Sequence, residues 1–123
     1  MNKLILLFAA TLLAFTPSLL QAKRSAPKDV APVKIGDIEY SAPHSRMACI
    51  EIHDTKADTI AWRQIYIVVV ERSLEKDVQD CFINSLEVKD GALLIKNERG
   101  GEFKLDPTTL NVQVLKGALI INK

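Results

Sequence analysis

Residues 60–71, Ile60-Ala61-Trp62-Arg63-Gln64-Ile65-Tyr66-Ile67-Val68-Val69-Val70-Glu71, decide the fold class. In an extended chain, one face of this stretch carries Ile60, Trp62, Tyr66, Val68 and Val70, and the other carries Ile65, Ile67 and Val69. This alternation is typical of a β-strand, and apolar residues on both faces are typical of a strand in the middle of a fold. We therefore predict one central strand over residues 60–71.

Shorter period-two patterns surround this strand. They cover residues 34–40, 47–53, 81–88, 92–97, 102–105 and 110–121. Asp90-Gly91 is the strongest short hairpin signal, and Gly100-Gly101 marks another turn. Residues 73–80 are the one place where a short helical turn is plausible, with Ser73 available as N-cap. We predict an all-β domain of seven or eight short antiparallel strands, arranged as a sandwich, a small barrel or two propeller-like units.

The N-terminal region has the order of a secretory signal. Lys3 is followed by an apolar run to about Phe15, and the small residue Ala22 suits a cleavage site. An uncleaved membrane anchor is the alternative, but the run is shorter than the roughly 20 residues that a membrane-spanning helix needs. We predict a signal peptide over residues 1–22, a flexible linker over 23–33 and one β domain over 34–123. The expected localisation is periplasmic or secreted.

The charge of the exported part is balanced. Cleavage after Ala22 removes only Lys3 among the charged residues, which leaves 15 basic and 15 acidic side chains. Nucleic-acid binding needs a face dense in lysine and arginine, because phosphate neutralisation supplies most of the affinity. The composition therefore argues against a nucleic-acid partner.

The two cysteines, Cys49 and Cys81, both lie in the exported part. An oxidising compartment favours a disulfide between them, which would close a loop of 32 residues and contribute about 3–4 kcal/mol. The alternative is two buried thiols that behave as small apolar residues. We predict the disulfide, with the buried thiols left open as the second possibility.

An internal repeat with an offset of 52 residues sharpens the architecture. The segment DTKADTIAW, residues 54–62, aligns without gaps to DPTTLNVQV, residues 106–114. Each copy begins with an aspartate, Asp54 or Asp106, and each follows an alternating strand. An aspartate in this place is expected to accept backbone N–H bonds and hold a tight turn.

The repeat resembles the blades of quinoprotein-like (PQQ-type) β-propellers. Asp54 and Trp62 match two positions of the blade motif, and Asp106, Thr109 and Val114 match it more loosely. Asp58 and Leu110 stand where the family has its turn glycine. The resemblance implies a type of sheet, with the Trp62 ring packed between neighbouring sheets, and it implies no cofactor. The chain also resembles several short secreted bacterial proteins of unassigned function, through residues 74–75, 77–79, 82–83 and 97–100.

Residues with chemical potential are few. His44 and His53 are the only histidines, and with Glu51 and Asp54 they could be drawn as a metal site, but they lack the dense spacing of three or four ligands that such sites use. No nucleophile-elbow pattern is present. We therefore predict no cofactor, no metal and no enzyme, and we interpret Trp62 as a packing residue.

The functional expectation follows by elimination. We predict an exported binding domain for another exported protein, which acts through sheet edges and loops, and a homo-oligomer is also possible. The candidate contact residues are His44 and Arg46 in one loop, and Glu98 and Arg99 in another. The alternative is an inhibitor of a secreted hydrolase that inserts one of these loops into an active site. A small hydrolase is the third hypothesis.

Overall fold

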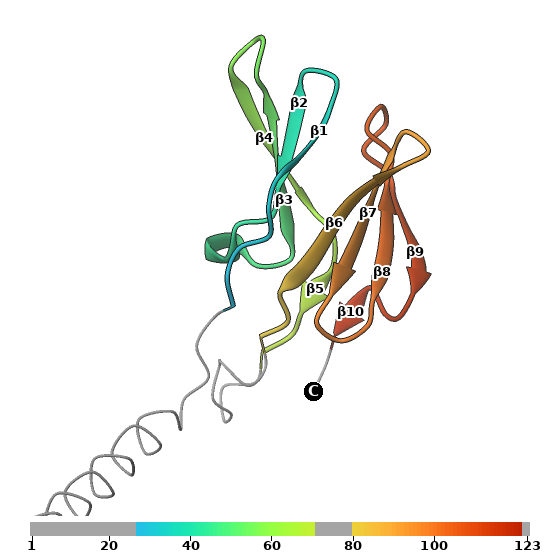
Figure 1. The fold of residues 1–123 in the computed structure, drawn as a ribbon. Coiled ribbons are helices and arrows are strands. Elements are labelled where there is room, and N and C mark those ends of the chain that lie inside the picture. The colour runs from blue at the N-terminus through green and yellow to red at the C-terminus, as the bar shows by residue number, and fades with distance from the viewer. Residues whose placement is uncertain (1–26, 71–79, 122–123) are drawn as a thin grey trace, which may run out of the picture.

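The computed structural model describes residues 27–70 and 80–121 (Figure 1). These residues form β-strands and one short 3-10 turn, so the prediction of an all-β fold is confirmed. The helical turn expected near 73–80 falls almost wholly outside the described residues, and so does the signal region. In the part that is described, no helix is long and apolar enough to cross a membrane.

The first sheet is a four-stranded antiparallel meander. Its strands are β1 (Val33–Ile35), β2 (Ile38–Ser41), β3 (Cys49–Asp54) and β4 (Thr59–Gln64), paired in that order. The 3-10 turn η1 (His44–Arg46) connects β2 to β3. Ile50 and Tyr40 are fully buried, so one face of this sheet packs on the core.

The second sheet repeats this plan. Its strands are β6 (Ile83–Lys89), β7 (Ala92–Asn97), β8 (Glu102–Leu105) and β9 (Val112–Lys116), again paired in chain order. Asp90 and Gly91 alone connect β6 to β7, and both have positive φ, as a type I′ hairpin turn requires. The hairpin predicted from this dipeptide is therefore confirmed.

The strand predicted over residues 60–71 is divided in the structure. It ends as β4 at Gln64, and the chain leaves the first sheet through Ile65 and Tyr66, which are buried. β5 (Ile67–Val68) then pairs in parallel with β10 (Ile120–Ile121) in a small separate sheet. Among the described residues of this run only Ile65 and Tyr66 are fully buried, Val68 packs partly against the core, and Ile60, Ile67, Val69 and Val70 are exposed, so the prediction of one strand buried on both sides is wrong.

The core lies between the two large sheets, which stand beside each other with β5 and β10 below them (Figure 1). Its largest fully buried side chains include Tyr40, Tyr66, Phe103, Ile50, Leu93 and Ile95. The rings of Tyr66 and Phe103 stack with centroids 5.4 Å apart. The segment that leaves the first sheet is thereby packed against the second.

The internal repeat has a common turn geometry. Asp54 Oδ1 accepts the backbone N–H groups of Lys56 and Ala57. Asp106 Oδ1 accepts those of Thr108 and Thr109 in the same way. Asp58 and Leu110, the two residues in the place of the turn glycine, both have positive φ. The predicted role of the two aspartates is confirmed, and each repeat forms the third hairpin of its sheet.

Candidate functional site

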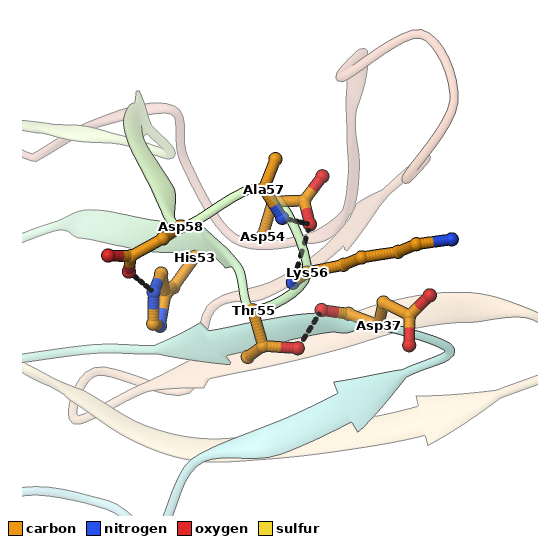
Figure 2. Close-up of polar contacts among 7 residues, drawn as sticks. All are labelled: Asp37, His53, Asp54, Thr55, Lys56, Ala57 and Asp58. Atoms are coloured by element: carbon orange, nitrogen blue, oxygen red, sulfur yellow. Dashed lines mark hydrogen bonds and ion pairs between the residues drawn. The ribbon is translucent and has the colours of Figure 1, made fainter.

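The β3–β4 hairpin end is the most polar cluster of the first sheet (Figure 2). Asp54 holds the turn, and His53 Nε2 lies 3.0 Å from the Asp58 carboxylate. The Thr55 hydroxyl donates to the Asp37 carbonyl and ties this hairpin to the β1–β2 turn. All these groups are committed to one another, so the cluster stabilises two turns.

The loop residue His44 is held against the body of the domain. Its side chain is only 10% exposed, Nδ1 donates to the Pro27 carbonyl over 2.7 Å, and its ring contacts the Phe82 ring. The His44 backbone N–H also bonds to Asp29. His44 therefore anchors the segment that precedes β1 and offers little surface to a partner.

Arg46 lies on the solvent side of the first sheet. Its guanidinium stands 4.3 Å from the centre of the Trp62 ring, in cation–π contact. Trp62 is directly opposite Glu51 on β3, on the face away from the buried Ile50. Trp62 thus packs on the outside of one sheet, which differs from the position between two sheets that the blade resemblance implied.

The second loop, which holds Glu98 and Arg99, is tied down from both sides. Glu98 Oε1 accepts the Phe82 N–H, and the Glu98 N–H bonds to the Phe82 carbonyl. The buried Asn97 accepts the N–H groups of Arg99 and Gly101 through its Oδ1 atom. These hydrogen bonds fix the backbone of the turn between β7 and β8.

Cys49 and Cys81 are both free and buried in the structure, so the predicted disulfide is not formed. The Cys81 backbone N–H donates to the Met47 sulfur, which lies 3.3 Å from the nitrogen. The Tyr66 hydroxyl donates to the Cys81 carbonyl. The alternative of two buried thiols is the arrangement present here.

The surroundings of the Tyr66 phenol and the Cys81 thiol favour the neutral, protonated form of each group. Burial raises the pKa of Tyr66 far above its ordinary value, and the adjacent Cys81 adds to this shift. Burial also raises the pKa of Cys81, against the opposing influence of Arg99. Both groups therefore bind their protons more tightly in the folded chain than in the unfolded chain.

This difference predicts alkaline sensitivity. The ordinary pKa is 9.0 for the thiol and 10.0 for the phenol, so the unfolded chain releases both protons first. The contribution of these two groups to the free energy of unfolding should not change with pH below about pH 9. Above the ordinary pKa of each group it should fall, by up to about 1.4 kcal/mol per pH unit for each. Tyr66→Phe should be less stable at neutral pH by about 1 kcal/mol, through its lost hydrogen bond, but should decline less steeply above pH 10. Urea unfolding across the alkaline range measures both slopes, and equal slopes would contradict the assignment.

An apolar groove lies where the β4–β5 connection meets β9 and β10. It encloses about 220 Å³ and is lined by Arg63, Gln64, Ile65, Tyr66, Ile67, Val112 and Leu119. Arg63 is the charged residue of the lining, and its guanidinium donates to the carbonyls of Leu110 and Gln64. The remaining walls are aliphatic or aromatic, apart from Gln64.

The groove continues into exposed apolar surface along β9. Val112 and Val114 lie opposite the fully buried Leu105 and Phe103, so they point toward the core side of the second sheet. Val114 is nevertheless 39% exposed and Leu119 is 46% exposed. Apolar side chains on the core side of the second sheet are therefore exposed at its β9 edge, and exposed apolar surface of this kind is typical of an interaction site.

Exposed apolar residues of β5 and β10 extend this surface. Ile67 pairs with Ile120, the Ile67 N–H bonds to the Leu119 carbonyl, and Val69 bonds to Ile121. Ile67, Val69, Val70 and Ile120 are all exposed. We call the groove with these residues and Val114 the apolar groove surface. Sequence reasoning noted the alternation at Val112 and Val114 but had no signal for the long-range pairing of β5 with β10.

The described residues hold no group of three or more histidine, cysteine, aspartate or glutamate side chains that could bind a metal ion. The candidate loop residues His44 and Glu98 are not brought together with His53 into one polar site. The most distinctive feature on the surface of the described residues is thus the apolar groove surface.

No protein-family model matches the chain, and neither a curated protein nor a solved structure was found to be similar to it. We therefore argue its function from its own sequence and geometry.

Proposed function

We propose that the chain is an exported, non-enzymatic binding domain whose apolar groove surface holds an apolar segment of another exported protein. The observation that carries the proposal is the exposure of Val114 and Leu119 beside a groove that opens toward the core. Contiguous apolar surface costs free energy in water and is typical of a surface that another protein covers. Export is the part of the proposal that comes from the N-terminal signal pattern.

The shape of the groove favours side chains of a protein over a small ligand. Pockets for drug-sized ligands enclose about 300–1,000 Å³. The groove is smaller, at about 220 Å³, and is open to the surface. One or two apolar side chains of an extended segment suit this volume.

The chemistry of the walls defines the partner. Arg63 is bonded to two carbonyl oxygens, and the walls next to it are Ile65, Tyr66 and Leu119. A lysine or arginine side chain entering the groove would lose its hydration and find no acidic partner among the lining residues. The segment that binds is therefore free of basic residues at this point and rich in aliphatic or aromatic residues.

Retention of partners from the native envelope or secreted fraction tests this proposal. Leu119→Asp should abolish capture of a stoichiometric partner, because it places a carboxylate at the groove. Val88→Asp is the matched control: Val88 is 40% exposed on β6, close to the value of Leu119, but does not line the groove. Equal capture by wild type, Leu119→Asp and Val88→Asp would overturn the proposal. Circular dichroism of both variants reports whether the fold is kept.

A further inference from the structure

The outer edge of β4 is less protected than the other edges of the two large sheets. Edge strands expose backbone N–H and C=O groups that can pair with another chain, and proteins usually blunt them with bulges, lysines, prolines or cover. β1 and β6 pack beside each other. Bulges interrupt the pairing of β6 with β7 and of β8 with β9, and β9 also carries Lys116.

β4 has a single charged residue, Arg63, and no bulge, lysine or proline. It pairs with β3 through six consecutive residue pairs without a bulge, and its sequence TIAWRQ contains neither lysine nor proline. Its first three residues, Thr59, Ile60 and Ala61, are exposed. Within residues 27–70 and 80–121, no strand pairs with its outer side. A regular strand edge of this kind, with one charge at Arg63, is a template for strand addition.

We propose that β4 pairs with β4 of a second copy of this chain, antiparallel about a twofold axis at Ala61. This register places Ala61 opposite Ala61 of the second copy and Ile60 opposite its Trp62. Twofold symmetry repeats the Ile60–Trp62 pair on the other side of the axis. Aromatic and β-branched residues are favourable cross-strand pairs, so the edge is complementary to itself.

The charges of β4 fit the same register. Arg63 is the only charged residue within β4, and it comes to lie opposite Thr59 of the second copy. Asp58, in the turn before the strand, lies opposite Gln64. No two like charges of β4 lie opposite each other across the axis. The pairing therefore needs no oppositely charged residue from a different partner.

The side of the first sheet on which Ile60 and Trp62 lie supports the pairing. Ile60 and Trp62 lie on the solvent face of the first sheet, opposite His53 and Glu51 of β3. In the dimer they form an apolar cluster that spans the axis, with the Arg46 guanidinium over each Trp62 ring. The two first sheets become one continuous eight-stranded sheet. This contact goes beyond the proposed partner binding, because it uses the backbone edge of β4, of which only Arg63 and Gln64 also line the groove.

A single strand pair buries less area than a standard protein interface, so the dimer should form reversibly with concentration. Sedimentation equilibrium of the exported protein, purified over a concentration series, should show a shift from monomer to dimer. Ala61→Lys and Ala61→Glu place two like charges at the axis, and each should weaken association by about tenfold or more. An equimolar mixture of the two variants should restore it as a heterodimer.

The control is Gln113→Lys, which adds the same charge to an exposed residue of the edge strand β9 and should leave the association unchanged. A wild-type chain that stays monomeric at its highest soluble concentration would overturn the proposal. So would a mixture of Ala61→Lys and Ala61→Glu that associates no better than either variant alone. Loss of the groove partner in Leu119→Asp leaves this dimer intact, so the two proposals fail separately.

Discussion

Replacing Phe103 by alanine should lower the free energy of unfolding by about 3–5 kcal/mol, the usual cost of removing a buried aromatic ring. Phe103 is fully buried on β8, lies opposite Ile95 of β7 and stacks on Tyr66. Tyr66 belongs to the segment that leaves the first sheet, so the variant loosens the packing between the two sheets. The loss is a large share of the about 5–15 kcal/mol that stabilises a typical domain.

Urea unfolding followed by circular dichroism measures this effect. Leu115→Ala is the control, because Leu115 lies on the neighbouring strand β9 and is exposed, so its change should stay within about 0.5 kcal/mol. A loss below about 1 kcal/mol for Phe103→Ala would show that the ring does not carry the contact between the sheets.

Replacing Asn97 by alanine should cost about 2–4 kcal/mol, because two backbone N–H groups lose their acceptor. Asn97 Oδ1 lies 3.0 Å from the Arg99 nitrogen and 2.8 Å from the Gly101 nitrogen. The residue is only 3% exposed, so water cannot readily replace it. The turn between β7 and β8 should then open, and the backbone amides of Arg99 and Gly101 should exchange faster with deuterium.

Asn97→Asp is the informative comparison. It keeps the acceptor oxygen for both N–H groups and puts a carboxyl oxygen in place of Nδ2, for which the described residues provide no hydrogen-bond partner; the comparison is made at a pH low enough to keep this buried carboxyl neutral. Its stability should lie closer to wild type than that of Asn97→Ala. If both variants are equally unstable, the acceptor role of Asn97 is not what holds the turn.

Local signals in the sequence predicted the turns and the fold class. Asp90-Gly91 gives a two-residue hairpin because both positions need positive φ. Asp54 and Asp106 hold equivalent turns because a short carboxylate can bond the N–H groups two and three residues ahead. These features depend on neighbouring residues only, so one sequence is enough to predict them.

The division of residues 60–71 depends on contacts far along the chain. The Ile65 N–H bonds to the Ala48 carbonyl, and the Ile67 N–H bonds to the Leu119 carbonyl. The alternation of apolar residues along such a run is the same whether its two halves belong to one sheet or to two. The break at Ile65 and Tyr66, the pairing with β10 and the groove that results were therefore beyond sequence reasoning.

The cysteines and the candidate loops show the same limit. The count of two cysteines and the expected export favoured a disulfide between Cys49 and Cys81, but both are free, buried thiols in the fold. His44 and Glu98 lie in predicted loops but bond to the backbone of Pro27 and Phe82. The prediction that Arg46, Glu98 and Arg99 contact a partner stays a prediction, since all three residues are exposed, whereas exposed apolar residues beside a groove could be recognised only in three dimensions.

Site-specific photocrosslinking tests the central claim most directly. A photoreactive amino acid at position 119, introduced into the chain in its native host, should give one covalent adduct of fixed mass with another exported protein. The same group at position 88, which is comparably exposed but outside the groove lining, should give none. Identical adduct patterns from the two positions, or no adduct from position 119, would contradict a partner bound at the apolar groove surface.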